Sequence, residues 1–412
     1  MLRPWRKILV VLAALAVVAV TAVSARAHTP VPVPAVPDSS GLRTHKALRN
    51  CHEGPPPPPL TPRDYRAASP SAPNPLVGEQ FLVSPVEPTR KAYHKYRREG
   101  QSYKASLMWK IAREPKFGWF GRWTRPRMQW KIREYLRCAQ LVQPGAVPLM
   151  VVLRHQGKKC GGGYDGGGRK EDARTRKWYR GFAKGVGNSR VVIGFEVDSL
   201  GTADCFKGRR YKDRMKLLRY GVDVLSKLPN ATIYLEAGAS DWEKASRTAR
   251  QLRYIGIRKV RGFMLNATHY DWTSANIKHG LKISRRTGGK HFIINTSWNG
   301  RGPVHFRKYY AKNKWRTINL YCHPQHRGAG PRPTTNTAHP KVDAYMWIGR
   351  SGYSGGKCNG GPLPVGSWWP ERALMFAANA TDWARPAKGT KYGWTRPFSL
   401  RTLGWCGLKP CP

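Results

Sequence analysis

Hydrophobic positions along the chain fall into short continuous runs separated by longer amphipathic stretches. The apolar, β-branched runs cover residues 146–153, 191–197, 232–235, 262–265, 292–294 and 344–348. Between the earlier runs lie stretches with charged faces, at residues 171–186, 209–228 and 243–255. Strands that are apolar on both faces and alternate with amphipathic helices are typical of a parallel sheet with crossover helices. Six such units favour an α/β protein whose sheet closes into a β/α (TIM-like) barrel over an open doubly wound sheet.

The start of the chain has a different pattern. Basic residues precede an apolar stretch of roughly 16 residues, shorter than the ~20 that a membrane-spanning helix needs. A small-x-small cleavage signal, Ala25-Arg26-Ala27, follows it. We therefore predict a signal peptide at 1–27, a Pro-rich linker at 28–73 and a barrel domain at 74–412. An uncleaved anchor is the alternative, and both interpretations place the rest of the chain outside the cytoplasm, with no membrane contact once the signal is cleaved.

Charge adds a question about partners. The 412 residues include 73 Lys+Arg and 23 Asp+Glu, a formal charge of +50, with 40% hydrophobic residues for a core. Such charge attracts polyanions, and anionic cell-surface polymers are candidate partners. The basic residues are spread through linker, helices and loops without a nucleic-acid motif, so we expect no specific nucleic-acid binding. The Gly-rich segment 161–168 lacks the GK[ST] ending of a P-loop, which argues against nucleotide binding.

Polar residues follow four of the apolar runs directly. Asp198, Glu236, Asn266 and Asn295 stand at or just after the ends of successive predicted strands. In β/α barrels the carboxyl ends of the strands surround one mouth, where chemistry takes place. Glu196 and Asp198 are two positions apart, so on an extended strand both would face the same side.

A dozen collinear segments carry a family resemblance. Gly194-Phe195-Glu196-Val197-Asp198-Ser199-Leu200 is similar to the strand that bears the catalytic acid of glycoside hydrolase family 6, the secreted cellulases (endoglucanases and cellobiohydrolases). Tyr234-Leu235-Glu236-Ala237-Gly238, followed by Trp242, resembles the family's next strand. The resemblance continues in order through residues 262–266, 291–300, 321–324, 333–335, 342–348, 360–362 and 367–371, with an entry at 74–78 and 81–85.

The resemblance implies a distorted β/α barrel that hydrolyses β-1,4-glucan with inversion. Inversion needs an acid on the glycosidic oxygen and a base for a water on the opposite sugar face. By position, Asp198 is the proton donor, Trp242 an aromatic platform for a sugar ring and Asn266 a sugar-binding amide. Glu236 and Tyr321, which replace an Asp and a Trp of the family, are further candidates for substrate binding. We expect a secreted monomer that acts on a polysaccharide, with no cofactor and no metal.

The eight cysteines are expected to form disulfides. Export means an oxidising compartment, and the sequence contains no CxxC pair of the kind that binds zinc. The family resemblance implies two bridges that brace loops, Cys160–Cys205 and Cys322–Cys358. The other four cysteines allow three pairings; they are Cys51, Cys138, Cys406 and Cys411.

Several substitutions depart from the family pattern in the site itself. Lys159 replaces an Asp that keeps the acid protonated, Gly355 replaces the family's candidate base, and Gly349 replaces a sugar-binding Lys. Further replacements affect the surroundings: Leu153 for Tyr, Ala239 for His, Asn295 for Asp, Trp298 for Arg and Tyr353 for Glu.

These departures leave two functions open. A Lys ammonium at 159 would favour the ionised form of Asp198, and Gly355 leaves the attacking water without a base. Asp165, in the glycine-rich loop, is a candidate rescue carboxylate. The chain is then either a hydrolase with an altered, slow mechanism or a catalytically impaired carbohydrate-binding pseudoenzyme. Arg154, Lys158 and Arg350 add positive charge nearby in sequence, which suggests acidic glycans as ligands.

Overall fold

The computed structural model describes residues 73–124, 127–154, 168–311, 314–382, 405–406 and 409–410. The predicted signal peptide and almost all of the predicted linker lie outside these residues, as do Lys158, Lys159, Cys160 and Asp165. None of the helices described is both long enough and apolar enough to cross a bilayer.

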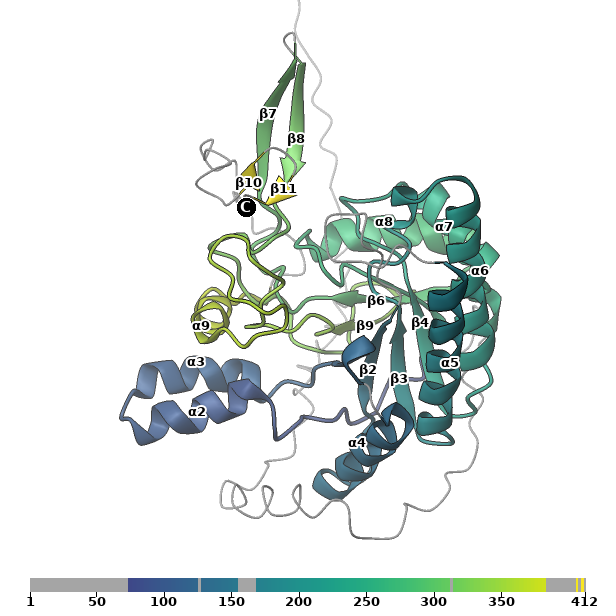
Figure 1. Ribbon diagram of the computed structural model, residues 1–412. Helices are drawn as coiled ribbons and strands as arrows, with labels where there is room; N and C mark the ends of the chain where they lie inside the picture. Colours follow the sequence, from purple (N-terminus) through teal and green to yellow (C-terminus); the bar gives the residue numbers. More distant parts are fainter. Residues whose placement is uncertain are drawn as a thin grey trace, which may run out of the picture. The chain divides into compact units, whose positions relative to one another are not determined.

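Seven parallel strands form one curled sheet, a half-barrel (Figure 1). Neighbouring strands follow the chain order β1-β2-β3-β4-β5-β6-β9. Their bounds are β1 (Gly118–Gly121), β2 (Leu149–Leu153), β3 (Val191–Phe195), β4 (Ala231–Glu236), β5 (Gly262–Leu265), β6 (His291–Asn295) and β9 (Val342–Met346). The six predicted strands and the α/β barrel class are confirmed, and β1 is a short strand that the hydrophobic pattern did not reveal.

Helices cover the outer face of the sheet. The predicted three are α5 (Arg169–Val186), α6 (Gly208–Leu225) and α7 (Ala245–Ile255), joined by α4 (Met128–Val142) and α8 (Thr273–Arg286). A smaller group packs around a separate apolar cluster and consists of α2 (Pro88–Arg98), α3 (Ser102–Ala112) and α9 (Pro370–Ala378). Two antiparallel pairs of strands form separate two-stranded sheets: β7 (His305–Ala311) with β8 (Lys314–Asn319), and β10 (Trp405–Cys406) with β11 (Lys409–Pro410).

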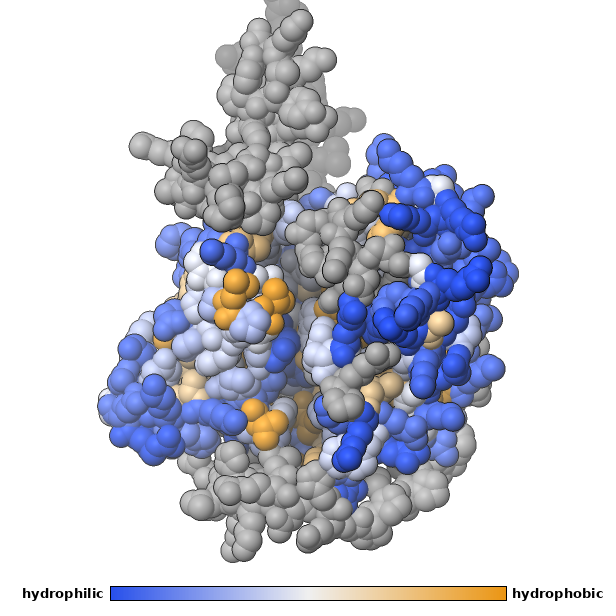
Figure 2. All heavy atoms as spheres, viewed as in Figure 1, coloured by the Kyte–Doolittle hydropathy of each residue, from blue (hydrophilic) through white to orange (hydrophobic). Residues whose placement is uncertain are grey.

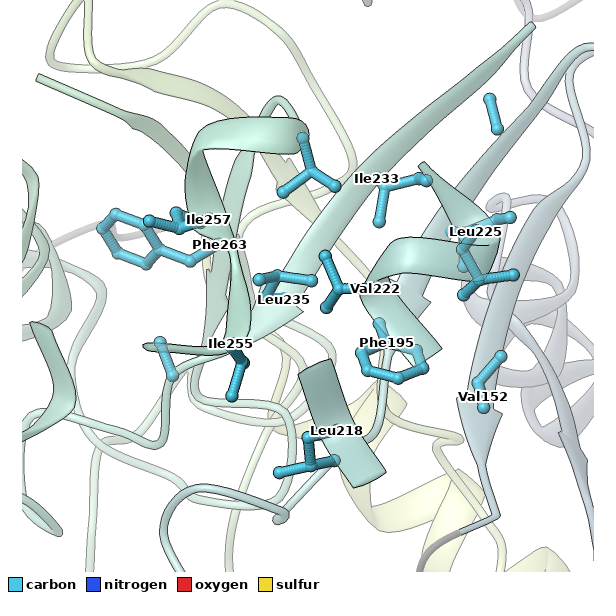
Figure 3. Packing of buried hydrophobic residues seen from close by; sticks show 14 of the residues in the cluster. Val152, Phe195, Leu218, Val222, Leu225, Ile233, Leu235, Ile255, Ile257 and Phe263 are labelled. Atoms are coloured by element: carbon cyan, nitrogen blue, oxygen red, sulfur yellow. The ribbon is translucent and has the colours of Figure 1, made fainter. Parts of the chain in front are cut away.

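Both faces of the strands are buried, which explains their continuous apolar runs. One set of strand side chains, including Val152, Phe195 and Leu235, packs against Leu218 and Val222 of α6 (Figure 3). The alternate set, including Val151, Val192 and Met264, forms a second cluster inside the curled sheet. Burying one such side chain contributes about 1.5–3 kcal/mol. Because alternate residues point to opposite faces, both faces are largely apolar, and the buried polar side chains lie near the two ends of the strands.

The two edge strands approach each other without forming a ladder among the described residues. Phe117, just before β1, donates its backbone N–H to the carbonyl of Trp347, just after β9, at 3.1 Å. The indole of Trp119 donates to the Ile348 carbonyl at 2.8 Å. The curled sheet is therefore bridged by single hydrogen bonds, which is the distortion expected for this barrel.

A buried polar network ties the strand starts together. Arg261 donates two hydrogen bonds of 2.8 Å to Asp343, which is fully buried. Tyr234 donates to the same carboxylate at 2.7 Å, and His291 Nδ1 lies 2.9 Å from it. Burial alone would raise the pKa of Asp343, but these hydrogen bonds and the Arg261 charge hold the pKa below its usual value.

Candidate active site

Asp198 lies at the mouth of the barrel, three residues beyond the end of β3. Its backbone has a φ of 65°, in the left-handed region, so the chain turns sharply here. Its carbonyl accepts hydrogen bonds from the Thr202 amide at 3.0 Å and the Thr202 hydroxyl at 2.6 Å. The Thr268 hydroxyl lies 2.6 Å from Asp198 Oδ1. Thr202 therefore fixes the backbone of Asp198 and Thr268 holds its carboxyl group, while Asp198 stays partly exposed.

Glu236, the last residue of β4, is buried beneath Asp198. Its two carboxylate oxygens accept the backbone N–H of Leu200 at 2.6 Å and of Gly238 at 2.5 Å. Burial, followed by the negative charge of Asp198, raises the pKa of Glu236 to about 8. Glu236 therefore shapes the loop that carries Asp198 and keeps a proton in the site at neutral pH. With 3% exposure it offers little surface to a sugar, and its expected contact with substrate stays a prediction.

The pairing of Glu196 with Asp198 on one face of an extended strand is wrong. Strand β3 ends at Phe195, and Glu196 also has a positive φ of 57°, so the backbone is no longer extended. Glu196 is fully buried, where its carboxylate accepts hydrogen bonds from the Tyr179 hydroxyl at 2.7 Å and the Arg154 backbone N–H at 3.1 Å. Glu196 anchors the strand end and Asp198 alone of the two reaches the mouth.

Asn266 and Asn295 brace adjacent strand ends. The Asn266 amide nitrogen donates to the carbonyls of Asp271 and Asn295, both at 3.1 Å. Asn295 donates back to the Asn266 carbonyl at 3.0 Å and accepts the backbone N–H of Ile348 at 2.9 Å. Both side chains are fully buried. Both Asn266 donors are thus committed to the backbone, and its predicted sugar contact has no support in these hydrogen bonds.

An aromatic stack lines the mouth beside Asp198. The His269 ring stacks on Trp242 at 4.5 Å and on Tyr321 at 5.9 Å, with interplanar angles of 11° and 8°. His269 Nδ1 lies 2.9 Å from Asp241, which holds the ring in place. Tyr321 is 53% exposed, and its pKa is raised by partial burial and then by the charge of Asp198. Trp242 and Tyr321, the two predicted aromatic contacts, are therefore brought together near the acid.

Two of the family departures have a structural explanation. A Cβ at Gly349 would lie 2.3 Å from the Trp298 ring, so Trp298 fills the space that a Lys side chain would need. Its indole donates to the His269 carbonyl at 2.8 Å. Gly355 is exposed and donates its N–H to His323 Nε2 at 2.7 Å. Burial lowers the pKa of His323 to about 4, so the ring accepts this bond as neutral imidazole.

The positive charge expected near the site is partly neutralised. Arg154 is 2% exposed and forms an ion pair of 2.7 Å with Glu171. Arg350 places its guanidinium 3.3 Å over the Tyr353 ring. Lys158 and Lys159 lie outside the described residues, so their effect on Asp198 stays a prediction. Arg154 does not supply the free charge that the sequence suggested.

The predicted bridge Cys322–Cys358 is confirmed, with the two Cα atoms 6.2 Å apart. It links the loop carrying Tyr321 to the loop carrying Gly355. Cys205 and Cys138 are also disulfide-bonded, while Cys160, the partner expected for Cys205, lies outside the described residues. Cys322, His323 and Cys358 are close enough to resemble a metal site, but their two sulfurs are bonded to each other and are unavailable as thiolates.

Thr268, His269 and Asp241 were missed by the sequence analysis. Thr268 and His269 belong to the polar segment that follows β5, two and three residues beyond Asn266. Their position just past a strand end was the available signal, because such residues line a barrel mouth. The pairing of His269 with Asp241 joins two loops and could not be read from spacing.

The comparisons with known proteins agree with this geometry. Residues 76–380 match the family Glycosyl hydrolases family 6. Endoglucanase A of Cellulomonas fimi is 33% identical over 296 residues, covering 72% of this chain and 61% of that protein. Endoglucanase A of Thermobispora bispora is 29% identical over 276 residues, covering 66% of this chain and 56% of that protein. The match therefore spans about six-tenths of the length of these relatives.

Solved structures give the same result. The endoglucanase Cel6 from Mycobacterium tuberculosis, in complex with methyl-cellobiosyl-4-deoxy-4-thio-β-D-cellobioside, has a TM-score of 0.65 and 32% identity, and the alignment covers 74% of this chain and 99% of that one. Endoglucanase CEL6B from Humicola insolens, at 20% identity and a TM-score of 0.60 over 75% of this chain and 99% of that one, shares the fold. Sequence motifs, barrel and comparisons converge, and the chain belongs to glycoside hydrolase family 6.

Proposed function

We propose that this protein is a glycoside hydrolase that cleaves β-1,4-glucan with inversion, with Asp198 as the proton donor. The observation that carries the proposal is the placement of Asp198 at the barrel mouth, fixed by Thr268 and Thr202 above the buried Glu236. The relatives named endoglucanase support a glucan as the substrate class. The predicted signal peptide supports secretion.

Glu236 supplies the feature that the substitution at Lys159 was expected to remove. A general acid must carry a proton at the working pH, and a neighbouring carboxylate favours that state. At neutral pH that proton lies on Glu236, whose pKa is raised to about 8 by burial and then by the charge of Asp198, and we propose that it passes to Asp198 when substrate binds. Proton transfer from Asp198 to the glycosidic oxygen then leaves a carboxylate that Thr268 stabilises by donating its hydroxyl hydrogen.

Binding without turnover is the second candidate, favoured by Gly355. This glycine has no side chain to activate water, and its neighbour His323 already accepts the Gly355 N–H. A cleft with Trp242 and Tyr321 would still bind a glucan chain through aromatic contacts with sugar rings.

Reducing-sugar release from a neutral β-1,4-glucan tests the proposal. Asp198→Asn should lower turnover by at least ~100-fold, the usual contribution of a general acid. Asp213→Asn, an exposed change on α6, is the matched control and should retain activity. Unchanged turnover in Asp198→Asn would remove Asp198 from the mechanism. Calorimetric binding of cello-oligosaccharide by a wild-type protein that releases no sugar would favour the pseudoenzyme.

A further inference from the structure

A basic groove lies between α4 and α5, on the helical layer of the barrel. Its volume is about 1150 Å³. Six cationic residues line it: Arg127, Arg133, Arg174, Lys177, Arg180 and Lys184. All six are exposed, and the described surface over α5, α6 and α7 is mostly hydrophilic in Figure 2. None of the residues assigned to the candidate active site lines this groove.

Two glycines bring the helices that form the groove into close contact. A Cβ at Gly181 would lie 2.7 Å from Met128 Cε, and one at Gly185 would lie 2.7 Å from Ile132 Cβ. Gly181 faces Met128, and Gly185, four residues further along α5, faces Ile132, four residues further along α4. The two helices therefore run in the same direction. Close packing at glycine makes the groove a fixed feature of the two backbones.

The cations form two rows along the groove. On α5 they occur at 174, 177, 180 and 184, and residues three or four apart on a helix are neighbours at about 5–6 Å. On the facing side, Arg127 lies just before α4 and Arg133 lies on α4, with Trp130 midway between them in the sequence. A ligand lying along the groove would meet a row of positive charges on α5 and two arginines on the facing side.

Much of this charge is not neutralised. Arg174 lies 3.6 Å from Glu171, and Arg180 donates to the Tyr220 hydroxyl at 2.7 Å. Arg133, Lys177 and Lys184 form no ion pair with any carboxylate in the described parts of the chain. Repeated uncompensated charges in a groove attract a polyanion more strongly than scattered charges do.

We propose that the α4–α5 groove binds an acidic polysaccharide of the polyuronate type. Trp130, between Arg127 and Arg133 in the sequence, is 46% exposed. The ring of a uronate sugar can contact its indole while the carboxylate of the same sugar pairs with an arginine guanidinium. A single exposed indole suits this ligand better than single-stranded nucleic acid, whose binding sites stack successive bases on several aromatic rings. Membership of a glycan-acting family also favours a polysaccharide. The inference goes beyond the proposed hydrolysis and does not depend on it.

Calorimetric titration of the full chain with oligogalacturonate tests the groove. Arg133→Gln/Lys177→Gln should weaken binding about five- to tenfold at low salt, as expected for two exposed ion pairs, and less at ~0.15 M salt. Lys216→Gln/Arg250→Gln, at exposed positions on α6 and α7, is the matched control with the same loss of charge and should change affinity less than about twofold. Equal weakening in both pairs would show attraction by total charge alone and overturn the proposal. If the groove pair lowers the melting temperature, Arg127→Gln/Lys184→Gln replaces it.

A second comparison identifies the class of polymer. Trp130→Ala should weaken oligogalacturonate binding at least threefold, whereas Tyr103→Ala, at a residue 71% exposed on α3, should not. Neutral cello-oligosaccharide should bind equally to wild type and the groove variant. If single-stranded DNA with the same number of charges binds the wild-type groove as tightly as oligogalacturonate does, the site is for nucleic acid and the polysaccharide assignment is wrong.

Discussion

Carboxyl groups at the two ends of the barrel lie in opposite chemical settings. At the strand starts, Asp343 is surrounded by Arg261, His291 and Tyr234, and its pKa is lowered. At the strand ends, Glu236 has two backbone donors and the negative charge of Asp198 nearby, and its pKa is raised to about 8. Both carboxyl groups are buried, so burial does not explain the difference. The neighbours do, since Asp343 has a cation and Glu236 has a second acid.

Asp343 therefore contributes to stability, whereas Glu236 belongs to the candidate active site. The ionised form of Asp343 stabilises the fold fully at any pH above the ordinary Asp pKa of 3.8. This contribution is lost as the pH falls from 3.8 through the lowered pKa of the folded state. Ionisation of Glu236 lowers the stability of the fold, but at neutral pH the group keeps a proton next to Asp198, the proposed acid. A buried carboxyl group whose pKa is raised by burial and by a neighbouring acid is typical of a functional site.

The largest effect should follow from removing the strand-start acid. Asp343→Ala leaves the Arg261 guanidinium buried without its partner, so the free energy of unfolding should fall by about 3–5 kcal/mol. Asp223→Ala breaks an exposed ion pair with Lys259 and should cost at most about 1 kcal/mol. Urea unfolding of both variants measures the difference. Similar losses would mean that the Asp343 network does not stabilise the barrel.

A smaller effect should appear when Glu236 is made permanently neutral. Between its ordinary pKa of 4.5 and the folded value of about 8, the folded chain binds more protons than the unfolded chain. Wild-type stability therefore falls as the pH rises through this window, by about 1.4 kcal/mol per pH unit from this group. Glu236→Gln removes that dependence at the constant cost of one hydrogen bond.

Unfolding curves of wild type and Glu236→Gln at about pH 6 and pH 8 give the comparison. Between these two pH values, the free energy of unfolding of the wild type should fall by about 2–3 kcal/mol relative to that of Glu236→Gln. If the free energies of unfolding of the two proteins change equally with pH, Glu236 has an ordinary pKa and does not hold a proton in the site at neutral pH.

The smallest effect concerns the missing base. A Cβ at Gly355 meets only His323 within 4 Å, at 3.3 Å, so Gly355→Asp should fold and raise turnover about tenfold by activating water. Gly349→Lys is the contrasting variant, because Trp298 occupies its space and the protein should lose stability. Reducing-sugar assays and thermal melts distinguish the two. A Gly355→Asp protein that folds with unchanged turnover would place the base elsewhere.

Sequence reasoning recovered the parts that repeat a simple pattern. Buried parallel strands need apolar residues on both faces, so β2 to β6 and β9 were visible as runs. β1 was missed because Gly118-Trp119-Phe120-Gly121 is short and bounded by glycine. The helix α8 was missed because its polar face dominates the sequence. The bridge Cys322–Cys358 followed from the family resemblance and not from spacing.

The site was predictable by position and less so by role. Asp198, Trp242 and Tyr321 were expected at the mouth, and the structure places them there. The expected face shared by Glu196 and Asp198 failed because both adopt positive φ after the strand ends, which alternation along a strand does not predict. The filling of the Gly349 space by Trp298 depends on contacts between distant loops, which neither residue reveals alone.

The anomeric configuration of the first-formed product tests the central claim most directly. Proton NMR during hydrolysis of a soluble β-1,4-glucan oligomer by the wild-type protein should show the α-anomer first, followed by mutarotation. That result is required if Asp198 protonates the glycosidic oxygen while water attacks the opposite face. Initial formation of the β-anomer, or full product formation by Asp198→Asn, would contradict the account.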